Sequence, residues 1–175
     1  AAAVARSVPI DCLLLPPQDE SEDIARLLQE AGQSRCEFIK SGQRHKLGRA
    51  LITVLAAPTG VPGTAYGGGN ERSAIIKVEE GGRSFVFTGD ATAEEELLAV
   101  SEEVRTDVLK VSHHGSKTSS GEEFLYAAAP RLTVISVGAD NRFGHPAPET
   151  LEKLQGIGAR IARTDRAGNV KVVFD

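Results

Sequence analysis

The chain has 175 residues, of which 41% are hydrophobic, and it carries a formal net charge of −4 at pH 7. This length and apolar content are sufficient for one globular domain with a buried core. The slightly acidic balance argues against a protein that coats nucleic acid non-specifically, because such proteins carry a basic excess. The apolar runs are far shorter than the roughly 20 residues of a membrane-spanning helix, and no secretory signal opens the chain. We therefore expect a soluble domain.

The chain contains no methionine, so we expect it to begin inside a longer protein. Cys12 and Cys36 are too few for a disulfide framework and match no zinc-ribbon spacing, so we interpret both as small buried apolar residues. A basic cluster between Arg35 and Arg49 is interpreted as the solvated surface of a hairpin.

The first half of the chain predicts short strands joined by turns. We expect strands at 8–15, 36–39 and 50–55, and an amphipathic helix at 21–31 that Gly32 ends. The glycines and prolines of 57–70 predict a loop, including the run Gly67–Gly69, which lacks the form of a phosphate-binding loop. Segments 73–79 and 83–88 predict a hairpin across Gly81 and Gly82.

The second half predicts alternating strands and helices. We expect helices at 93–100, 121–129 and 148–155, and strands at 108–111, 132–137, 160–163 and 169–174. The strands at 108–111 and 132–137 are nearly continuous apolar runs, which is typical of strands buried on both faces. The order therefore predicts an α/β architecture with a mixed sheet covered by helices.

Candidate metal ligands follow three of the predicted strands. Asp90 comes directly after Thr88-Gly89, His113 and His114 precede Gly115, and His145 follows the strand at 132–137. Carboxylate and imidazole groups are the ligands by which proteins hold zinc, manganese or iron. The sequence thus predicts a site at one rim of the sheet.

Simpler interpretations stay open for each of these residues. Asp90 could cap the helix at 93–100, the two adjacent histidines could be turn residues, and His145 could close the turn before the helix at 148–155. We expect serines of 116–120 to cap the helix at 121–129. Lys110 lies either at a sheet face or near the metal carboxylates. A serine triad is disfavoured because no Gly-x-Ser-x-Gly turn is present.

Several motifs carry a specific resemblance. TGD at 88–90, DVLKVSHHGSKTS at 107–119, ISVGADNRFGHPAPE at 135–149 and RTDRAG at 163–168 resemble the metallo-β-lactamase-like domain at the end of ComEC-family competence proteins, which form DNA-uptake channels. The resemblance covers most of residues 50–175 and is looser over 1–50. It implies a single domain over 1–175 that forms the C-terminal part of an αββα sandwich.

The resemblance also implies a function. It predicts a binuclear site that holds zinc or manganese and hydrolyses phosphodiesters, with Asp90 and His114 as metal ligands. His113 is expected to contact phosphate, and His145 to bind phosphate or shuttle a proton. The expected partners are DNA, of which the non-imported strand would be degraded, and the rest of a bacterial inner-membrane channel protein. The domain is expected on the extracytoplasmic side.

One departure limits that expectation. Members of the superfamily carry a His-x-His-x-Asp-His loop that supplies most metal ligands, and this chain has histidines only at 45, 113, 114 and 145. We therefore expect the chain to begin after that loop, and to bind one metal weakly or none, so that it is inactive alone. A non-catalytic DNA-docking or structural module, or a hydrolase of another ester on the same fold, are the alternatives. The aromatic content of 5% weakens a base-stacking role.

Overall fold

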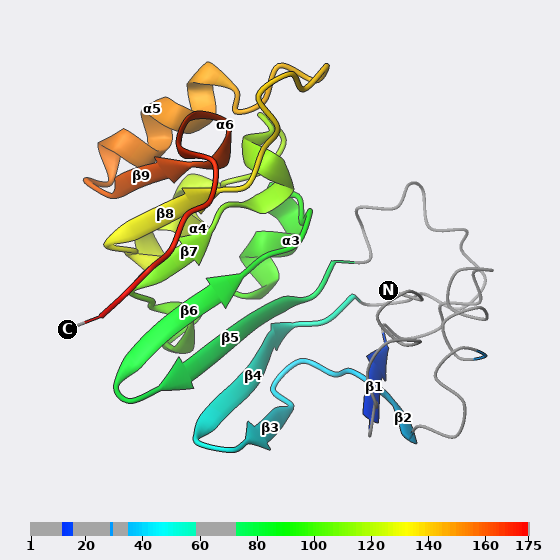
Figure 1. Ribbon diagram of the computed structural model, residues 1–175. Coiled ribbons are helices and arrows are strands. Elements are labelled where there is room, and N and C mark those ends of the chain that lie inside the picture. The colour runs from blue at the N-terminus through cyan, green and yellow to red at the C-terminus, as the bar shows by residue number, and fades with distance from the viewer. Residues whose placement is uncertain (1–11, 16–28, 30–34, 59–72, 175) are drawn as a thin grey trace.

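The computed structural model describes residues 12–15, 29, 35–58 and 73–174 (Figure 1). Its largest feature is a seven-stranded sheet in which the strands lie side by side in chain order. Those strands are β3 (Arg44–Leu47), β4 (Ala50–Ala56), β5 (Ile75–Glu80), β6 (Arg83–Phe87), β7 (Val108–Lys110), β8 (Leu132–Ile135) and β9 (Arg160–Arg163). A separate parallel pair joins β1 (Cys12–Leu15) to β2 (Arg35–Phe38).

The first part of the large sheet is an antiparallel meander from β3 to β6. The predicted hairpin between β5 and β6 is confirmed. Its two turn residues, Gly81 and Gly82, have φ angles of +59° and +75°. Only glycine adopts this pair of angles without steric cost, and such turns match the twist of the strands that they join. The turn therefore sets the register that brings β6 straight into Asp90.

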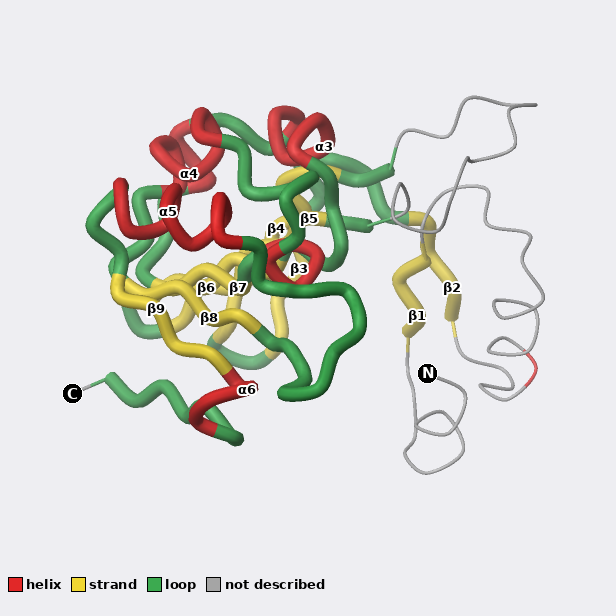
Figure 2. Tube along the Cα trace, turned by 90° about the horizontal axis from the view of Figure 1, so that it is seen from above, coloured by secondary structure: helices red, strands yellow, loops and turns green. Residues whose placement is uncertain are grey.

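The second part of the sheet is parallel from β6 to β9, with a helical crossover between successive strands. Helices α3 (Ala93–Leu98), α4 (Glu122–Ala128) and α5 (Pro148–Gly156) all cover the same face of the sheet (Figure 2). A single helical turn lies at Glu102–Val104, and the turn at Ser112–Gly115 has a left-handed backbone at His113 and His114. The predicted mixed sheet flanked by helices is confirmed.

The main hydrophobic core lies between this face and the helices. Alternate strand residues point to opposite faces, so Val86, Leu109 and Ile135 pack beneath Phe124 and Leu154 of the helices, and all five are buried. The core therefore depends on the parallel strands, whose carboxyl ends also carry the candidate site residues.

The predicted strand at 169–174 is wrong. After β9 the chain forms a short helix, α6 (Thr164–Ala167), and Gly168 at φ +66° turns it away from the sheet edge. The segment then runs along the face opposite α3–α5, where the ring of Phe174 meets that of Phe85 at 5.4 Å between centroids. This segment is therefore held to the sheet by side-chain packing and not by the backbone hydrogen bonds expected of a strand.

Other sequence expectations fall outside the described residues or need a smaller correction. The predicted helix at 21–31 and the loop at 57–70 lie largely beyond what the structure describes. Cys12 is free but half-buried rather than fully buried. In the described part of the chain, no helix is both long enough and apolar enough to span a bilayer.

Candidate metal-binding site

Three parallel strands end at one edge of the sheet, and the residues that follow them carry the candidate site. Asp90 follows β6, the histidine pair follows β7, and Ser136 begins the segment after β8. The Thr88 hydroxyl donates to the Lys110 carbonyl at 2.8 Å. Strands of one direction present their carboxyl ends together, which brings groups distant in sequence to a common rim.

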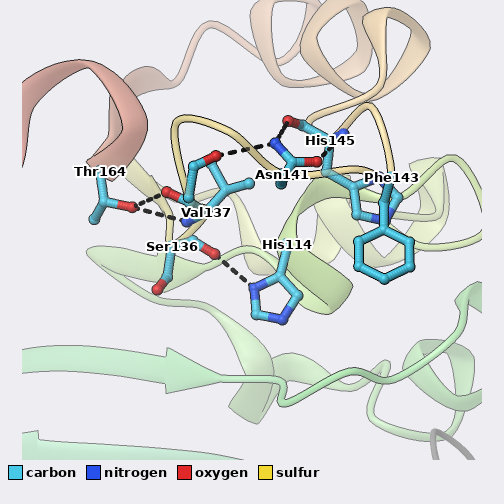
Figure 3. A pocket seen from close by; sticks show the side chains of 8 residues that line it. His114, Ser136, Val137, Asn141, Phe143, His145 and Thr164 are labelled. Atoms are coloured by element: carbon cyan, nitrogen blue, oxygen red, sulfur yellow. Dashed lines mark hydrogen bonds between the residues drawn. The ribbon is translucent and has the colours of Figure 1, made fainter.

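Asp90 and His114 face each other across this rim. The Nε2 atom of His114 lies 3.6 Å from Oδ1 of Asp90, and both side chains are a little under half exposed. The Nδ1 atom of the same ring lies 2.6 Å from the Ser136 carbonyl oxygen (Figure 3). A carbonyl only accepts, so Nδ1 carries the proton and the lone pair of neutral His114 is on Nε2, beside the carboxylate.

The other two histidines lie next to this pair. The His113 ring lies 6.5 Å from that of His114 and 5.7 Å from that of His145, between centroids. The structure therefore brings Asp90 and the three histidines together, as the sequence leads one to expect.

The backbone at the histidine pair is strained. His113 and His114 have φ angles of +46° and +55°, in the left-handed region that non-glycine residues seldom occupy. The His113 N–H donates to the Gly89 carbonyl at 3.1 Å, which ties this turn to the end of β6. Such strain persists only where the surroundings hold the backbone in place, and it concentrates at functional sites.

His145 is held by its own loop. The amide group of Asn141 donates to the carbonyls of Gly138 and His145, at 3.0 and 2.8 Å, and its oxygen accepts the His145 N–H at 2.9 Å (Figure 3). Partial burial, with the charges of His113 and His114 in second place, lowers the pKa of His145 below its ordinary value. This ring is therefore neutral near pH 7.

Glu96 supports the site from beneath, and sequence reasoning missed it. This α3 carboxylate is 1% exposed and accepts the Ser112 hydroxyl and the backbone N–H groups of Ser120 and Gly121. Burial raises its pKa, although the hydrogen bonds oppose that shift. It lies three residues before the buried Ala99, so helical spacing was the signal that places it on the inner face.

Lys110 lies beside the site, near the Asp90 carboxylate, which is one of the two positions that the sequence allowed. Its Nζ atom donates to the carbonyls of Gly89 and Val111, at 3.1 and 3.2 Å. Burial lowers the pKa of this lysine, and the charge of Asp90 partly restores it. Lys110 therefore ties the ends of β6 and β7 together and sets a positive charge near the carboxylate.

The structure excludes the alternative that Asp90 caps α3, and the expectation that serines of 116–120 cap the next helix is wrong. Thr92, not Asp90, caps α3: its hydroxyl accepts the Glu95 N–H, and the Glu95 carboxylate accepts the Thr92 N–H. The N-cap residue of α4 (Glu122–Ala128) is Gly121, which has no capping side chain, and Glu96 of α3 accepts its N–H instead. The carboxylate of Asp90 is therefore not used as a helix cap.

A pocket of about 470 Å³ opens beside the histidines. It is lined by His114, Ser136, Val137, Gly138, Asn141, Phe143, His145 and Thr164 (Figure 3). Its wall beneath Val137 is fixed by Thr164, whose hydroxyl accepts the Val137 N–H at 2.7 Å. The pocket thus combines a possible metal ligand, a neutral histidine and a stable wall.

The donor set fits a single ion. Zinc binds nitrogen and oxygen at roughly 2.0–2.2 Å, so one ion can lie between Asp90 Oδ1 and His114 Nε2 at their separation of 3.6 Å. Within the ranges that the structure describes, no three histidine, cysteine or acidic side chains gather closely enough to form a complete site. The described residues supply two ligands.

The chain matches a known protein family over more than half of its length. The model of the metallo-beta-lactamase superfamily matches residues 33–139. The chain belongs to this superfamily. Among solved structures, the metal-dependent hydrolase Tm1679 of the beta-lactamase superfamily is similar, with a TM-score of 0.56 and 11% identity over 91% of this chain and 70% of that one. At this identity the likeness shows the fold.

The chain is also similar to competence proteins. It is 34% identical over 157 residues to ComE operon protein 3 of Bacillus subtilis (strain 168), which covers 89% of this chain and 19% of that protein. It is 33% identical over 102 residues to competence protein ComA of Neisseria gonorrhoeae, covering 57% of this chain and 15% of that protein. The predicted resemblance to ComEC-type competence domains is confirmed, and the chain spans about a fifth or less of these relatives.

Proposed function

We propose that this metallo-β-lactamase domain is a metal-dependent phosphodiesterase that cleaves DNA in a DNA-uptake protein. The observation that supports it best is the arrangement of His114, whose Nδ1 is bonded to the Ser136 carbonyl while Nε2 faces Asp90. Donation from Nδ1–H to a backbone carbonyl leaves the Nε2 lone pair free to bind a metal ion, and Asp90 offers a second ligand beside it. The competence relatives suggest DNA as the substrate.

Each residue at the rim has a role in this proposal. Asp90 and His114 hold a zinc or manganese ion, which when bound lowers the pKa of water to about 7 and neutralises charge on the phosphate. His145 is neutral near pH 7 because its pKa is lowered, so it accepts a proton. His113, beside both rings, contacts a phosphate oxygen.

A second candidate function is a non-catalytic DNA-docking module on the same fold. The observation that favours it is the two-ligand donor set among the described residues. Catalytic zinc sites have three protein ligands and an open position, so two ligands predict weak metal binding. Hydrolysis of a different ester is the remaining alternative on this fold.

The place of the domain in its protein is also a proposal. Because the chain spans a small part of each competence relative, we propose that it works as one domain, over 1–175, of a bacterial inner-membrane channel protein. Degradation of the non-imported strand places it on the extracytoplasmic side, and its partners are DNA and the rest of the channel.

Metal binding and cleavage test these functions separately. Zn²⁺ and Mn²⁺ are titrated by calorimetry into the wild type, Asp90→Asn and His114→Gln, with His45→Gln as the control outside the site. We expect the first two substitutions to abolish binding and the control to keep it. Binding that survives both would remove these residues from the metal site.

Cleavage is then measured on a 5′-labelled single-stranded oligonucleotide with Mn²⁺. We expect products from the wild type extended upstream within its parent protein, none from the same protein with His145→Gln at pH 7, and none from residues 1–175 alone. Metal binding without any cleavage by the extended wild type would favour the docking module, and cleavage of a thioester or lactone in place of DNA would favour the third alternative.

A further inference from the structure

Phe143 is the most exposed large hydrophobic side chain among the described residues, at 82%. It lies on the loop between β8 and α5, at the pocket that also contains His114 and His145 (Figure 3). Single exposed hydrophobic residues are common on protein surfaces. An aromatic ring directly beside a candidate catalytic histidine can contact a ligand bound there, and the residues around Phe143 indicate the kind of ligand.

The loop presents this ring in a fixed place. Asn141, two residues earlier, makes three hydrogen bonds that close the loop from Gly138 to His145. The Ala147 N–H donates to the Gly115 carbonyl at 2.8 Å, which anchors the end of the loop at the turn of the histidine pair. The position of Phe143 is therefore set relative to the rim.

The orientation of the ring is also set. It stacks on the His145 ring at 5.8 Å between centroids, with 19° between the planes. One face of Phe143 is turned to the imidazole, and the high exposure leaves the other face to solvent. A flat apolar face next to a site for an anionic phosphate suits a ligand that combines a phosphate with a planar ring.

We propose that Phe143 is a stacking platform for a nucleobase of the strand whose phosphate lies at Asp90 and His114. This inference rests on the proposed function and names the subsite that recognises nucleic acid. Stacking of a base on an aromatic side chain is tolerant of sequence, because every base has a π-face. The domain would therefore bind single strands of any sequence by one base and its phosphate.

The absence of tryptophan from the chain offers a direct measurement. Phe143→Trp introduces a single tryptophan, and Tyr126→Trp is the matched control, because Tyr126 is 66% exposed on α4. Each variant is titrated in the presence of Zn²⁺, which the proposed phosphate site requires, with a thymidine 12-mer and with an abasic tetrahydrofuran 12-mer. We expect the thymidine oligomer alone to quench the tryptophan at 143, and neither oligomer to quench the control.

Affinity gives the second measurement. By fluorescence polarisation, we expect Phe143→Ala to weaken binding of the thymidine 12-mer by roughly 5- to 150-fold, the range for loss of one stacked base, and to leave the abasic oligomer unchanged. Tyr126→Ala should change neither. Equal quenching by both oligomers, or an unchanged affinity in Phe143→Ala, would overturn the platform.

The two proposals fail in different ways. If base-dependent quenching occurs and the extended wild type binds metal but never cleaves DNA, the phosphodiesterase is wrong and the stacking site stands. If the extended wild type cleaves DNA and the same protein with Phe143→Ala cleaves the thymidine oligomer as fast at limiting substrate, the platform is wrong and the phosphodiesterase stands.

Discussion

Substitution of Gly115 tests whether the site depends on the close approach of the Gly115 backbone to Pro146. It follows the histidine pair at φ +83°, and a Cβ atom there would lie 2.6 Å from Cβ and 3.1 Å from Cα of Pro146. Carbon atoms prefer to be about 3.5–4.0 Å apart, so Gly115→Ala must push Pro146 and the adjacent His145 outward. The substitution should therefore affect both stability and site geometry.

The magnitude has two parts. Placing alanine in the left-handed region costs about 1–2 kcal/mol, and overpacking against a well-packed neighbour costs about 1–3 kcal/mol. Gly115→Ala should then lower the free energy of unfolding by about 2–5 kcal/mol. Gly158→Ala is the matched control, because Gly158 has φ +73° and nothing within 4 Å of the added Cβ. It should cost about 1–2 kcal/mol.

Urea denaturation gives the two free energies, and NMR of the His145 ring reports on the site. We expect the ring signals of His145 to shift in Gly115→Ala and to stay in place in Gly158→Ala. Equal losses of stability in the two variants, with unmoved His145 signals, would show that Gly115 and Pro146 do not need to be in contact.

Three further substitutions probe the supports of the site. Glu96→Gln should cost about 1–3 kcal/mol in urea denaturation, because it leaves a buried donor unpaired. Burial raises the pKa of Glu96 above its ordinary 4.5, so wild-type stability should fall as pH rises from about 4.5 through the raised pKa, and the variant should lack this slope. Asn141→Ala should speed hydrogen exchange of the His145 amide, and unchanged exchange would contradict the loop clamp. The NMR pKa of His145 should lie below 6.5 and rise in His113→Gln; a value that does not move would remove the influence of His113.

Most of the parallel sheet was predictable because its signals are local. Short apolar runs predicted β7 and β8, and Gly81 with Gly82 predicted the hairpin before β6. The segment at 169–174 alternates like a strand, yet the bidentate Arg163–Asp165 pair and α6 intervene after β9. Alternating apolar residues predict that one face of a segment is buried. They do not determine whether the segment pairs with a sheet edge by backbone hydrogen bonds or packs its side chains against a sheet face.

The site divides in the same way. Residue types and their positions after strands predicted that Asp90 and the histidines gather at one rim. The support from Glu96 could not be predicted with equal force, because a glutamate on a helix is ordinarily solvated. Its three partners come from two segments 16–25 residues further along the chain.

The order of strands, the chemistry of the residues that end them and membership of the superfamily were thus written in the sequence, since each depends on neighbours along the chain. Tertiary structure decided which nitrogen of His114 faces Asp90, and that the exposed Phe143 ring stacks beside the His145 ring. Those features are set by the Ser136 carbonyl, just after β8, and by the closure of a loop, and such contacts exist only after distant segments have packed.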